Sequence, residues 1–493
     1  MTMNKIFIFL LFTLLLTTIG CGGEYDVFED SYLEYSKSDS KITVDELDKL
    51  IDHIKLFDNE RKFKKFFTNG SFDEVKLISF LEKEGEKIEK RNNVDESKDY
   101  FVNVYIENSG SMNGYVQGNT QFKGAIRDLL VMLKYYYDEK NLKINFINSA
   151  IYPTNVEGNI VDFSKSLSTK TFKVGDTYSS NLNNIFKQIL TKTSQNTISI
   201  LLSDCIYSIK GNKTEDLLSD QKSLTKDAFL TKFKNKEPLA TTIVKLNSSF
   251  NGTYYDKDNK KTQLNNISRP YYMSIVGSEK AMMKFNSNIE LSKNKVEGFE
   301  NKYNLTLKDY SKEVYYSVIN TKEDSGRYKP DRAHKSTGSI KGIENISINK
   351  RNSSSFIFSV ALDLSNVPIE DSYVSDKSNY NIREGDYKIK GIYKFDKKQL
   401  GPSSINMLSK AKAEPTHYIV FESTKPNFTN LSLALKKQIP NWVYTTSTND
   451  DSNILKSPNS TFGIKYLIEG ISEAYETQSK NNNYLELTIN IKK

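Results

Sequence analysis

The stretch that most constrains this chain is residues 100–115, YFVNVYIENSGSMNGY. Its first half is an apolar run long enough for a buried strand. A carboxylate and two hydroxyls then occupy alternate positions, at Glu107, Ser109 and Ser111. Glycine relaxes the backbone there, so the three oxygens can turn toward one point, as the ligands of a hard cation such as Mg²⁺ do. The same residues also suit a plain Ser/Asn/Gly turn, and only the rest of the chain distinguishes the two interpretations.

Strands and helices alternate after this stretch. Apolar spacing predicts further strands and helices at 122–136, 142–151, 181–193, 197–202, 224–233, 241–246, 270–276 and 279–285. This alternation predicts a doubly wound, Rossmann-like α/β domain over residues 97–293. Residues 294–493 differ, because strand patterns dominate, apart from helices expected at 430–438 and 462–475. They predict a C-terminal β-rich, sandwich-like domain with one or two helices.

The first twenty residues are typical of an export signal. Lys5 precedes the apolar run IFIFLLFTLLL, which is too short for a comfortable membrane span. Residues 18–21, TIGC, resemble a bacterial lipobox, which implies cleavage before Cys21 and lipidation of its sulfur. A plain secretory signal is the alternative. The other cysteine, Cys205, then has no partner, so no disulfide is expected.

Residues 21–42 predict a lipidated polar tether, and their acidic start resembles the export tags of surface lipoproteins in Bacteroidetes-type bacteria. Residues 43–96 predict a helical N-terminal segment, because two capping-box patterns precede apolar residues at helical spacing. Its basic stretch at 60–67, ERKFKKFF, suits either anionic head groups or a helix end with a buried Phe face. We therefore expect an outer-membrane lipoprotein of the cell envelope, surface-exposed and attached to the membrane through the lipid on Cys21.

The composition narrows the classes of function. The length of 493 residues allows roughly three domains. The formal charge of +8 is small for this length and is spread along the chain, so nucleic-acid binding is not expected. His53, His334 and His417 lie far apart, which weakens zinc and Ser-His-Asp interpretations.

Oxygen-bearing side chains follow several of the predicted strands and precede one helix. Glu107, Ser109 and Ser111 follow the first strand, Asp204 follows the strand at 197–202, and Ser180 precedes the helix at 181–193. Open α/β sheets bind ligands beyond the carboxyl ends of their strands. This topology can therefore gather the oxygens at one edge.

Three of these segments resemble the motifs of von Willebrand factor A (VWA) domains. Residues 107–112 (ENSGSM) are similar to Asp-x-Ser-x-Ser, residues 180–182 (SNL) to Thr-Asn-Ile/Leu, and residues 201–204 (LLSD) to Leu-Leu-Thr-Asp. In that family the three loops form the metal-ion-dependent adhesion site (MIDAS), which holds Mg²⁺ or Mn²⁺ and is completed by an acidic group of a ligand. The resemblance, over about 200 residues, implies a set of metal ligands: Glu107, Ser109, Ser111, Ser180 (with Thr177 as a rival) and Asp204.

Three positions depart from the family pattern and bear on metal affinity rather than on the fold. Glu107 is one methylene longer than the family's Asp, Ser180 replaces Thr, and Cys205 replaces Gly. Ordinary structural roles also stay open, because Ser180 can cap its helix and Asp204 can close the turn after its strand.

Three functions are compatible with these residues. The first is a lipid-anchored cell-envelope binding protein that recognises a protein or other acidic ligand through a MIDAS-like divalent cation. The second is a metal-independent structural scaffold of an envelope complex. The third is an envelope hydrolase, which is less favoured because His-Glu-x-x-His, Gly-x-Ser-x-Gly and P-loop patterns are absent from the sequence. Glu384 and Asp386 flank a glycine as turn residues do, and we expect no enzymatic activity.

Overall fold

The computed structural model describes residues 23–39, 41–68, 71–88, 100–154, 160–178, 180–209, 213–234, 238–331, 338–348, 355–384, 386–411 and 413–493. The chain folds into two compact units, Met1–Glu96 and Ser97–Lys493. The predicted signal peptide at residues 1–20 and Cys21 lie outside the described residues. Among the helices that are described, none is long and apolar enough to cross a membrane.

The first unit is helical and has an aromatic core. Its elements are α2 (Glu24–Asp39), α3 (Val44–Leu56), the 3₁₀-helix η2 (Arg61–Phe66), β1 (Phe67–Thr68), β2 (Ser71–Phe72) and α4 (Glu74–Lys83). The tether predicted at 21–42 is wrong over α2, because Tyr25, Phe28 and Tyr32 lie at i, i+3 and i+7 and are buried as one stripe of a helix. Phe63 and Phe66 of η2 are also buried, which agrees with the helix-end interpretation of the basic stretch.

A seven-stranded mixed sheet forms the centre of the α/β domain in the second unit. In sheet order its strands are β5 (Ile151–Thr154), β4 (Leu142–Ile147), β3 (Phe101–Glu107), β6 (Thr197–Ser203), β8 (Lys261–Ser278), β7 (Leu239–Tyr255) and β9 (Phe299–Thr306). β3 lies between β4 and β6 and is parallel to both. All seven residues of β6 are buried, as a strand covered on both faces requires.

The sheet departs from a doubly wound parallel order beyond β6. β7 and β8 form one long antiparallel hairpin, and β8 lies between β6 and β7. The turn of the hairpin spans Asp256 to Lys260, with Asn259 in the left-handed region at φ 59°. Because such a short turn can only return the chain antiparallel to itself, β8 takes the place that a crossover strand has in a doubly wound sheet.

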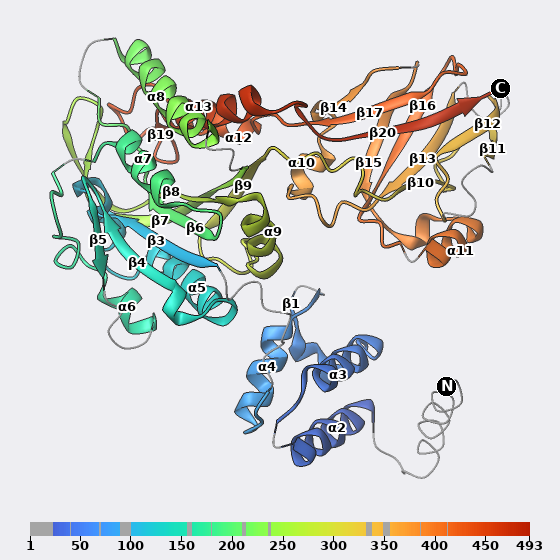
Figure 1. Ribbon diagram of the computed structural model, residues 1–493, viewed down its shortest axis with the longest axis horizontal. Coiled ribbons are helices and arrows are strands. Elements are labelled where there is room, and N and C mark those ends of the chain that lie inside the picture. Colours follow the sequence, from blue (N-terminus) through green and yellow to red (C-terminus); the bar gives the residue numbers. More distant parts are fainter. Residues whose placement is uncertain are drawn as a thin grey trace. The chain divides into compact units, whose positions relative to one another are not determined.

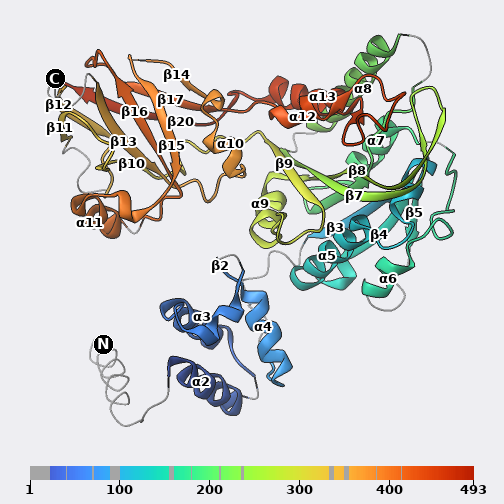
Figure 2. The ribbon, with the colours of Figure 1, turned by 180° about the vertical axis from the view of Figure 1, so that it is seen from behind.

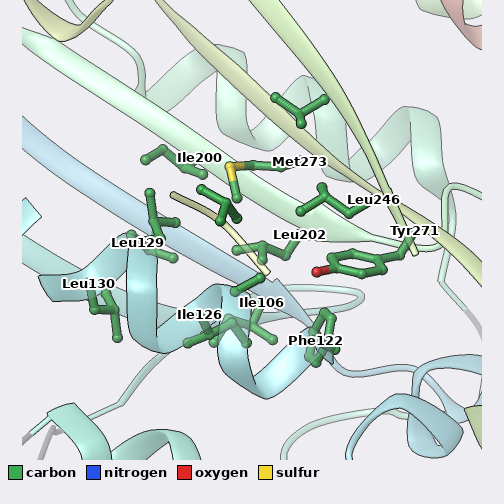
Figure 3. Packing of buried hydrophobic residues seen from close by; sticks show 14 of the residues in the cluster. Ile106, Phe122, Ile126, Leu129, Leu130, Ile200, Leu202, Leu246, Tyr271 and Met273 are labelled. Atoms are coloured by element: carbon green, nitrogen blue, oxygen red, sulfur yellow. The ribbon is translucent and has the colours of Figure 1, made fainter. Parts of the chain in front are cut away.

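Helices cover both faces of this sheet (Figures 1 and 2). One face packs against α5 (Gln121–Tyr136), α6 (Ile160–Ser166) and α9 (Glu279–Asn288), and the other against α7 (Leu182–Lys192), α8 (Thr214–Lys234), α12 (Asn441–Thr445) and α13 (Ile464–Gln478). Figure 3 shows the first interface, where Ile126 and Leu129 of α5 face Ile106 and Leu202 of the central strands. This packing holds the ends of β3 and β6 in fixed positions.

Two sheets share one hydrophobic core in the β-rich domain. The first contains β10 (Tyr316–Ile319), β13 (Phe356–Leu362), β16 (His417–Ser423) and β15 (Lys388–Lys394), and the second β11 (Arg327–Pro330), β12 (Gly342–Ser347), β20 (Asn483–Lys492), β17 (Leu431–Lys436) and β14 (Tyr380–Ile382). The helix predicted at 430–438 is wrong, because Leu431, Leu433 and Leu435 are buried with the period of a strand. Two short helices accompany the sheets, α10 (Asp371–Ser375) and α11 (Pro402–Ala411).

Short elements complete the second unit: the 3₁₀-helices η3 (Gly110–Tyr115), η4 (Glu139–Asn141), η6 (Lys377–Asn379) and η7 (Lys397–Gln399), and the paired strands β18 (Ser447–Thr448) and β19 (Thr461–Phe462). Of these, η3 follows β3 directly and carries Ser111, so it contributes to the candidate site.

The boundary predicted between residues 293 and 294 differs from the structure. β9 pairs with β7 in the α/β sheet, and α13 buries Ile464, Leu467, Ile468 and Ile471 in the same core as α8. The β-rich domain is therefore inserted between β9 and α12, and β20 returns to it afterwards. The apolar stripe of α13 needs a partner face, and the α/β sheet supplies it.

Candidate metal site

The candidate site lies at the edge where β3 and β6 end. The two strands are parallel neighbours, and their register pairs Ile106 with Leu202. Glu107, the last residue of β3, and Ser203, the last residue of β6, therefore lie side by side. Because open α/β sheets bind ligands beyond the carboxyl ends of parallel strands, this is the edge at which the sequence predicts a site.

Glu107 is at the centre of a network of hydroxyl groups. It is only 2% exposed. Its Oε1 accepts hydrogen bonds from Ser109 Oγ at 2.8 Å and from Ser180 Oγ, and its Oε2 accepts one from Ser203 Oγ. A buried carboxylate needs such partners, and here three separate segments of the chain supply them.

Ser111 connects this network to a second carboxylate. Ser109 Oγ and Ser111 Oγ lie 3.1 Å apart, and the Ser111 hydroxyl is near enough to Asp204 to lower the pKa of its carboxyl. Asp204 is 3% exposed, and its Oδ1 also accepts the N–H of Ile206 at 3.2 Å. The structure thus joins Glu107, Ser109, Ser111 and Ser180 through hydroxyl contacts and places Asp204 beside them.

The second loop presents Ser180 rather than Thr177 to Glu107. The carbonyl of Thr177 accepts the N–H of Gly110 at 2.9 Å, so Thr177 holds the first loop through its backbone. The N-cap of α7 is Asn181, whose side chain accepts the N–H of the residue three positions on. Helix capping is therefore the role of Asn181, and the Ser180 hydroxyl serves the network instead.

Asn108 fixes the first loop against the segment that leads to Ser180. It is 1% exposed, and its amide donates to the carbonyls of Phe172 and Val174 at 2.8 Å each. Asn148, which follows β4, donates in turn to Oδ1 of Asn108 at 3.0 Å. These bonds tie three chain segments together beneath the serines, so the loop geometry is built in rather than dependent on a ligand.

The two carboxylates lie close together and away from water. Burial raises the pKa of Asp204 to about 7, and repulsion from Glu107 acts in the same direction. The nearby Ser111 hydroxyl, the hydrogen bond from the N–H of Ile206 and the charge of Arg269 lower this pKa without restoring its ordinary value. A divalent cation between the carboxylates would remove their repulsion.

Two residues that lie beside the site, Ser203 and Arg269, are not in the set of ligands predicted from the sequence. Ser203 follows from the parallel register, because the last residue of β6 must neighbour the last residue of β3. Arg269 carries no such signal, since its position depends on β8 lying next to β6. It is 1% exposed, and its Nη1 donates to the carbonyls of Pro458 at 2.6 Å and Ser460 at 2.9 Å.

Cys205 stands where the VWA pattern has glycine. Its φ of 53° lies in the left-handed region, which glycine adopts without steric cost. Its N–H donates to Ser203 Oγ at 2.9 Å. The thiol is buried, and burial raises its pKa well above the ordinary value.

The predicted ligands offer oxygen atoms only, from two carboxylates and three hydroxyls, and hard cations such as Mg²⁺ and Mn²⁺ prefer such donors. Within the described residues, no three or more His, Cys, Asp or Glu side chains are placed to hold a metal ion together. A cation at this edge would therefore depend on the serine hydroxyls. Comparison of the sequence with known protein families and with curated proteins finds no match.

Proposed function

We propose that this chain is a lipid-anchored cell-envelope protein that recognises a protein or other acidic ligand through a divalent cation, Mg²⁺ or Mn²⁺. The observation that carries the proposal is the convergence of the five predicted ligands, from three loops, at one edge of the sheet, where hydroxyl contacts join four of them. A VWA-like fold belongs to the same proposal. The sheet order β5-β4-β3-β6 with helices on both faces supports it. The apolar leader and Cys21 support the lipid anchor.

The donor set fits a cation that attracts an acidic ligand. Glu107, Ser109, Ser111, Ser180 and Asp204 would hold it, directly or through water. Hydroxyl ligands carry no charge, so a cation held largely by them still favours further anionic oxygen. A carboxylate on the partner supplies that oxygen.

An exposed aromatic side chain lies on the loop that leads into the site. Tyr178 precedes Ser180 by two residues and is 90% exposed. Tyrosine is enriched among residues that dominate binding energy, because it buries a large rigid surface at a small entropic cost. We expect Tyr178→Ala to weaken capture of the partner roughly tenfold while the response of the protein to Mg²⁺ is unchanged.

Thermal unfolding in Mg²⁺ and in EDTA tests the cation. The wild type is expected to unfold at a higher temperature in Mg²⁺, because the ion binds the folded state only. Ser111→Ala is expected to abolish that difference, whereas Ser223→Ala, on the exposed face of α8, keeps it. Identical wild-type melting curves in Mg²⁺ and EDTA would show that the cation part of the proposal is wrong.

A metal-independent scaffold is the second candidate, and one observation favours it. The Glu107 carboxylate accepts three hydroxyl hydrogen bonds from this chain alone, so the network is satisfied without a cation. Capture of a partner that survives both EDTA and Asp204→Ala would favour the scaffold. Loss of capture under either condition would favour the cation.

A further inference from the structure

Arg269 is a buried positive charge beside the candidate site, and the proposed function does not use it. Its side chain is 1% exposed. Nη1 donates to the carbonyls of Pro458 and Ser460, whereas Nε and Nη2 have no hydrogen-bond partner within the described residues. A charge that is removed from water is normally paired with an opposite charge, so a buried guanidinium in this position needs an explanation.

The register of the sheet places Arg269 at the edge that carries the site. β8 is antiparallel to β6, and Ser203, the last residue of β6, pairs with Tyr272. The chain before Tyr272 therefore runs past the end of β6, so Arg269 lies level with the turn that holds Asp204. Burial and repulsion from Glu107 raise the pKa of Asp204, and the charge of Arg269 is among the causes that lower it.

The guanidinium is held in place without a carboxylate partner of its own. It lies over the ring of Tyr254, with 4.7 Å between its Cζ and the ring centroid. The Tyr254 hydroxyl donates to Asp451 Oδ2 at 2.6 Å, which fixes the ring. Among the described residues, Arg127 and Arg383 form ion pairs with carboxylates, whereas Arg269 forms none. Its charge therefore acts on the nearby acids through the poorly polarisable interior.

The formal charges at this edge favour a ligand with one negative charge. When ionised, Glu107 and Asp204 supply two negative charges, and Arg269 supplies one positive charge. A divalent cation would then leave the site with one net positive charge, which is costly in a buried place and which one carboxylate of a ligand would cancel. Without Arg269, the same cation would be neutralised by Glu107 and Asp204 alone.

We propose that Arg269 is a specificity-determining residue of the cation site, and that its charge makes cation binding depend on one anionic group from the ligand. The inference rests on the proposed function, because it concerns the same cation. Arg269 acts through its electric field rather than by contact, since its side chain is buried. A proton on Asp204 does not reverse the direction of this effect, because the cation carries two charges and the competing proton carries one.

Calorimetric titration of the full chain with Mg²⁺ tests this dependence, with acetate as a probe that carries one carboxylate. The titration is done in sodium acetate and in sodium chloride of equal ionic strength. We expect wild-type Mg²⁺ affinity to be several-fold higher in acetate, because two ligands that favour each other do so reciprocally. Equal wild-type affinity in the two salts would overturn the inference alone. A wild type that binds no Mg²⁺ in either salt would overturn the proposed function as well.

Three variants separate the charge of Arg269 from its hydrogen bonds. Arg269→Gln removes the charge and keeps an amide donor for the carbonyls of Pro458 and Ser460. It should bind Mg²⁺ about tenfold more tightly in chloride and lose the effect of acetate. Arg269→Lys keeps a positive charge and should behave as the wild type in both salts. Arg327→Met removes an exposed charge from the β-rich domain and is the control, with unchanged affinity.

The variants can also contradict the inference while the cation site itself stands. Arg269→Gln with the Mg²⁺ affinity and the acetate effect of the wild type would overturn it. Arg269→Lys that behaves as Arg269→Gln would overturn it too, because the hydrogen bonds and not the charge would then set the affinity. If Arg269→Gln fails to fold, the acetate effect on the wild type and on Arg269→Lys still decides, since its absence in both contradicts the role of the charge.

Discussion

Two clusters in this chain place hydroxyl groups around a carboxylate, which is buried in one cluster and half-buried in the other. In the α/β domain, Glu107 accepts bonds from three serine hydroxyls. In the β-rich domain, Asp324 accepts bonds from Thr321 Oγ1 at 2.9 Å and Ser359 Oγ at 2.8 Å. Tyr328 OH lies 3.4 Å from this carboxylate and donates to the nearer Asn320 Oδ1 at 2.5 Å. Both carboxylates are thus surrounded by three hydroxyl groups.

The difference is a second carboxylate. Burial raises the pKa of both Asp204 and Asp324, and nearby hydroxyls lower both, but at Asp204 repulsion from Glu107 raises the pKa further. Hydroxyls around one carboxylate satisfy it and serve the fold, as at Asp324. Hydroxyls around two carboxylates leave excess negative charge, which a cation can neutralise. The number of acids, not the number of serines, therefore distinguishes a candidate cation site from a structural network.

The largest expected contrast is the response to Mg²⁺ after one carboxylate in each cluster is changed to an amide. At a Mg²⁺ concentration about a hundred times Kd, the wild type should gain about 2.7 kcal/mol in free energy of unfolding. Asp204→Asn should lose that gain, because it removes a charged ligand. Asp324→Asn should keep it. Denaturant unfolding with and without Mg²⁺ measures all three proteins.

Without Mg²⁺, the same two variants should change the free energy of unfolding in opposite directions. At pH 8, Asp204→Asn removes the repulsion between buried carboxylates and should raise the free energy of unfolding. Asp324→Asn replaces an acceptor oxygen by a donor among three hydroxyls and should lower it by about 1–3 kcal/mol. If both variants destabilise the protein equally and neither changes the Mg²⁺ response, the two clusters are alike and both are structural.

The pH dependence of stability is the next largest effect. The pKa of Asp204 is raised to about 7, so the folded state holds this proton more tightly than the unfolded state. Stability without metal should therefore fall as pH rises from about 4 to about 7, by up to about 1.4 kcal/mol per pH unit, and should level off above 7. The difference between the wild type and Asp204→Asn isolates this contribution.

Metal binding should show the opposite trend, because the cation competes with the proton on Asp204. Apparent Mg²⁺ affinity should fall about tenfold per pH unit below 7 and change little above it. Calorimetry at pH 6, 7 and 8 measures it. A constant affinity across this range would mean that Asp204 is not a ligand.

The part of the fold that carries the site could be predicted, because its signals are local. Buried parallel strands are short apolar runs, such as residues 197–202, and the polar residues that follow them mark the ligand-binding edge. The convergence of Glu107, Ser180 and Asp204 follows from that reasoning once the strands are parallel neighbours.

The rest depends on long-range pairing that no local pattern records. Nothing in residues 261–278 indicates that β8 lies between β6 and β7, and so Arg269 could not be placed near Asp204. The apolar stripe of α13 predicts a helix but not the sheet that it covers. Local patterns can also be too short to interpret. In β17, three leucines at alternate positions do not distinguish a strand from a helix.

A smaller effect tests whether the hydroxyls in the two clusters contribute equally. Ser203→Ala removes a donor to Glu107 and an acceptor for the N–H of Cys205, and Thr321→Ala removes a donor to Asp324. Each should lower the free energy of unfolding by about 1–2 kcal/mol. Only Ser203→Ala should also change Mg²⁺ affinity. Equal Mg²⁺ affinity in Ser203→Ala and the wild type would separate Ser203 from the site.

The smallest expected effect concerns backbone strain at two residues other than glycine that have a positive φ. Cys205 adopts φ 53° next to Asp204, and Asn345 adopts φ 55° in the β-rich domain. Asparagine tolerates this region better than cysteine, because its short polar side chain can bond locally. Cys205→Gly should therefore be more stable than Cys205→Ala by about 1 kcal/mol, with both lacking the buried sulfur. Asn345→Gly should exceed the wild type in free energy of unfolding by less than this difference of about 1 kcal/mol. If Cys205→Ala is as stable as Cys205→Gly, the left-handed turn after β6 stores no strain, and the replacement of glycine by cysteine at this edge has no energetic cost.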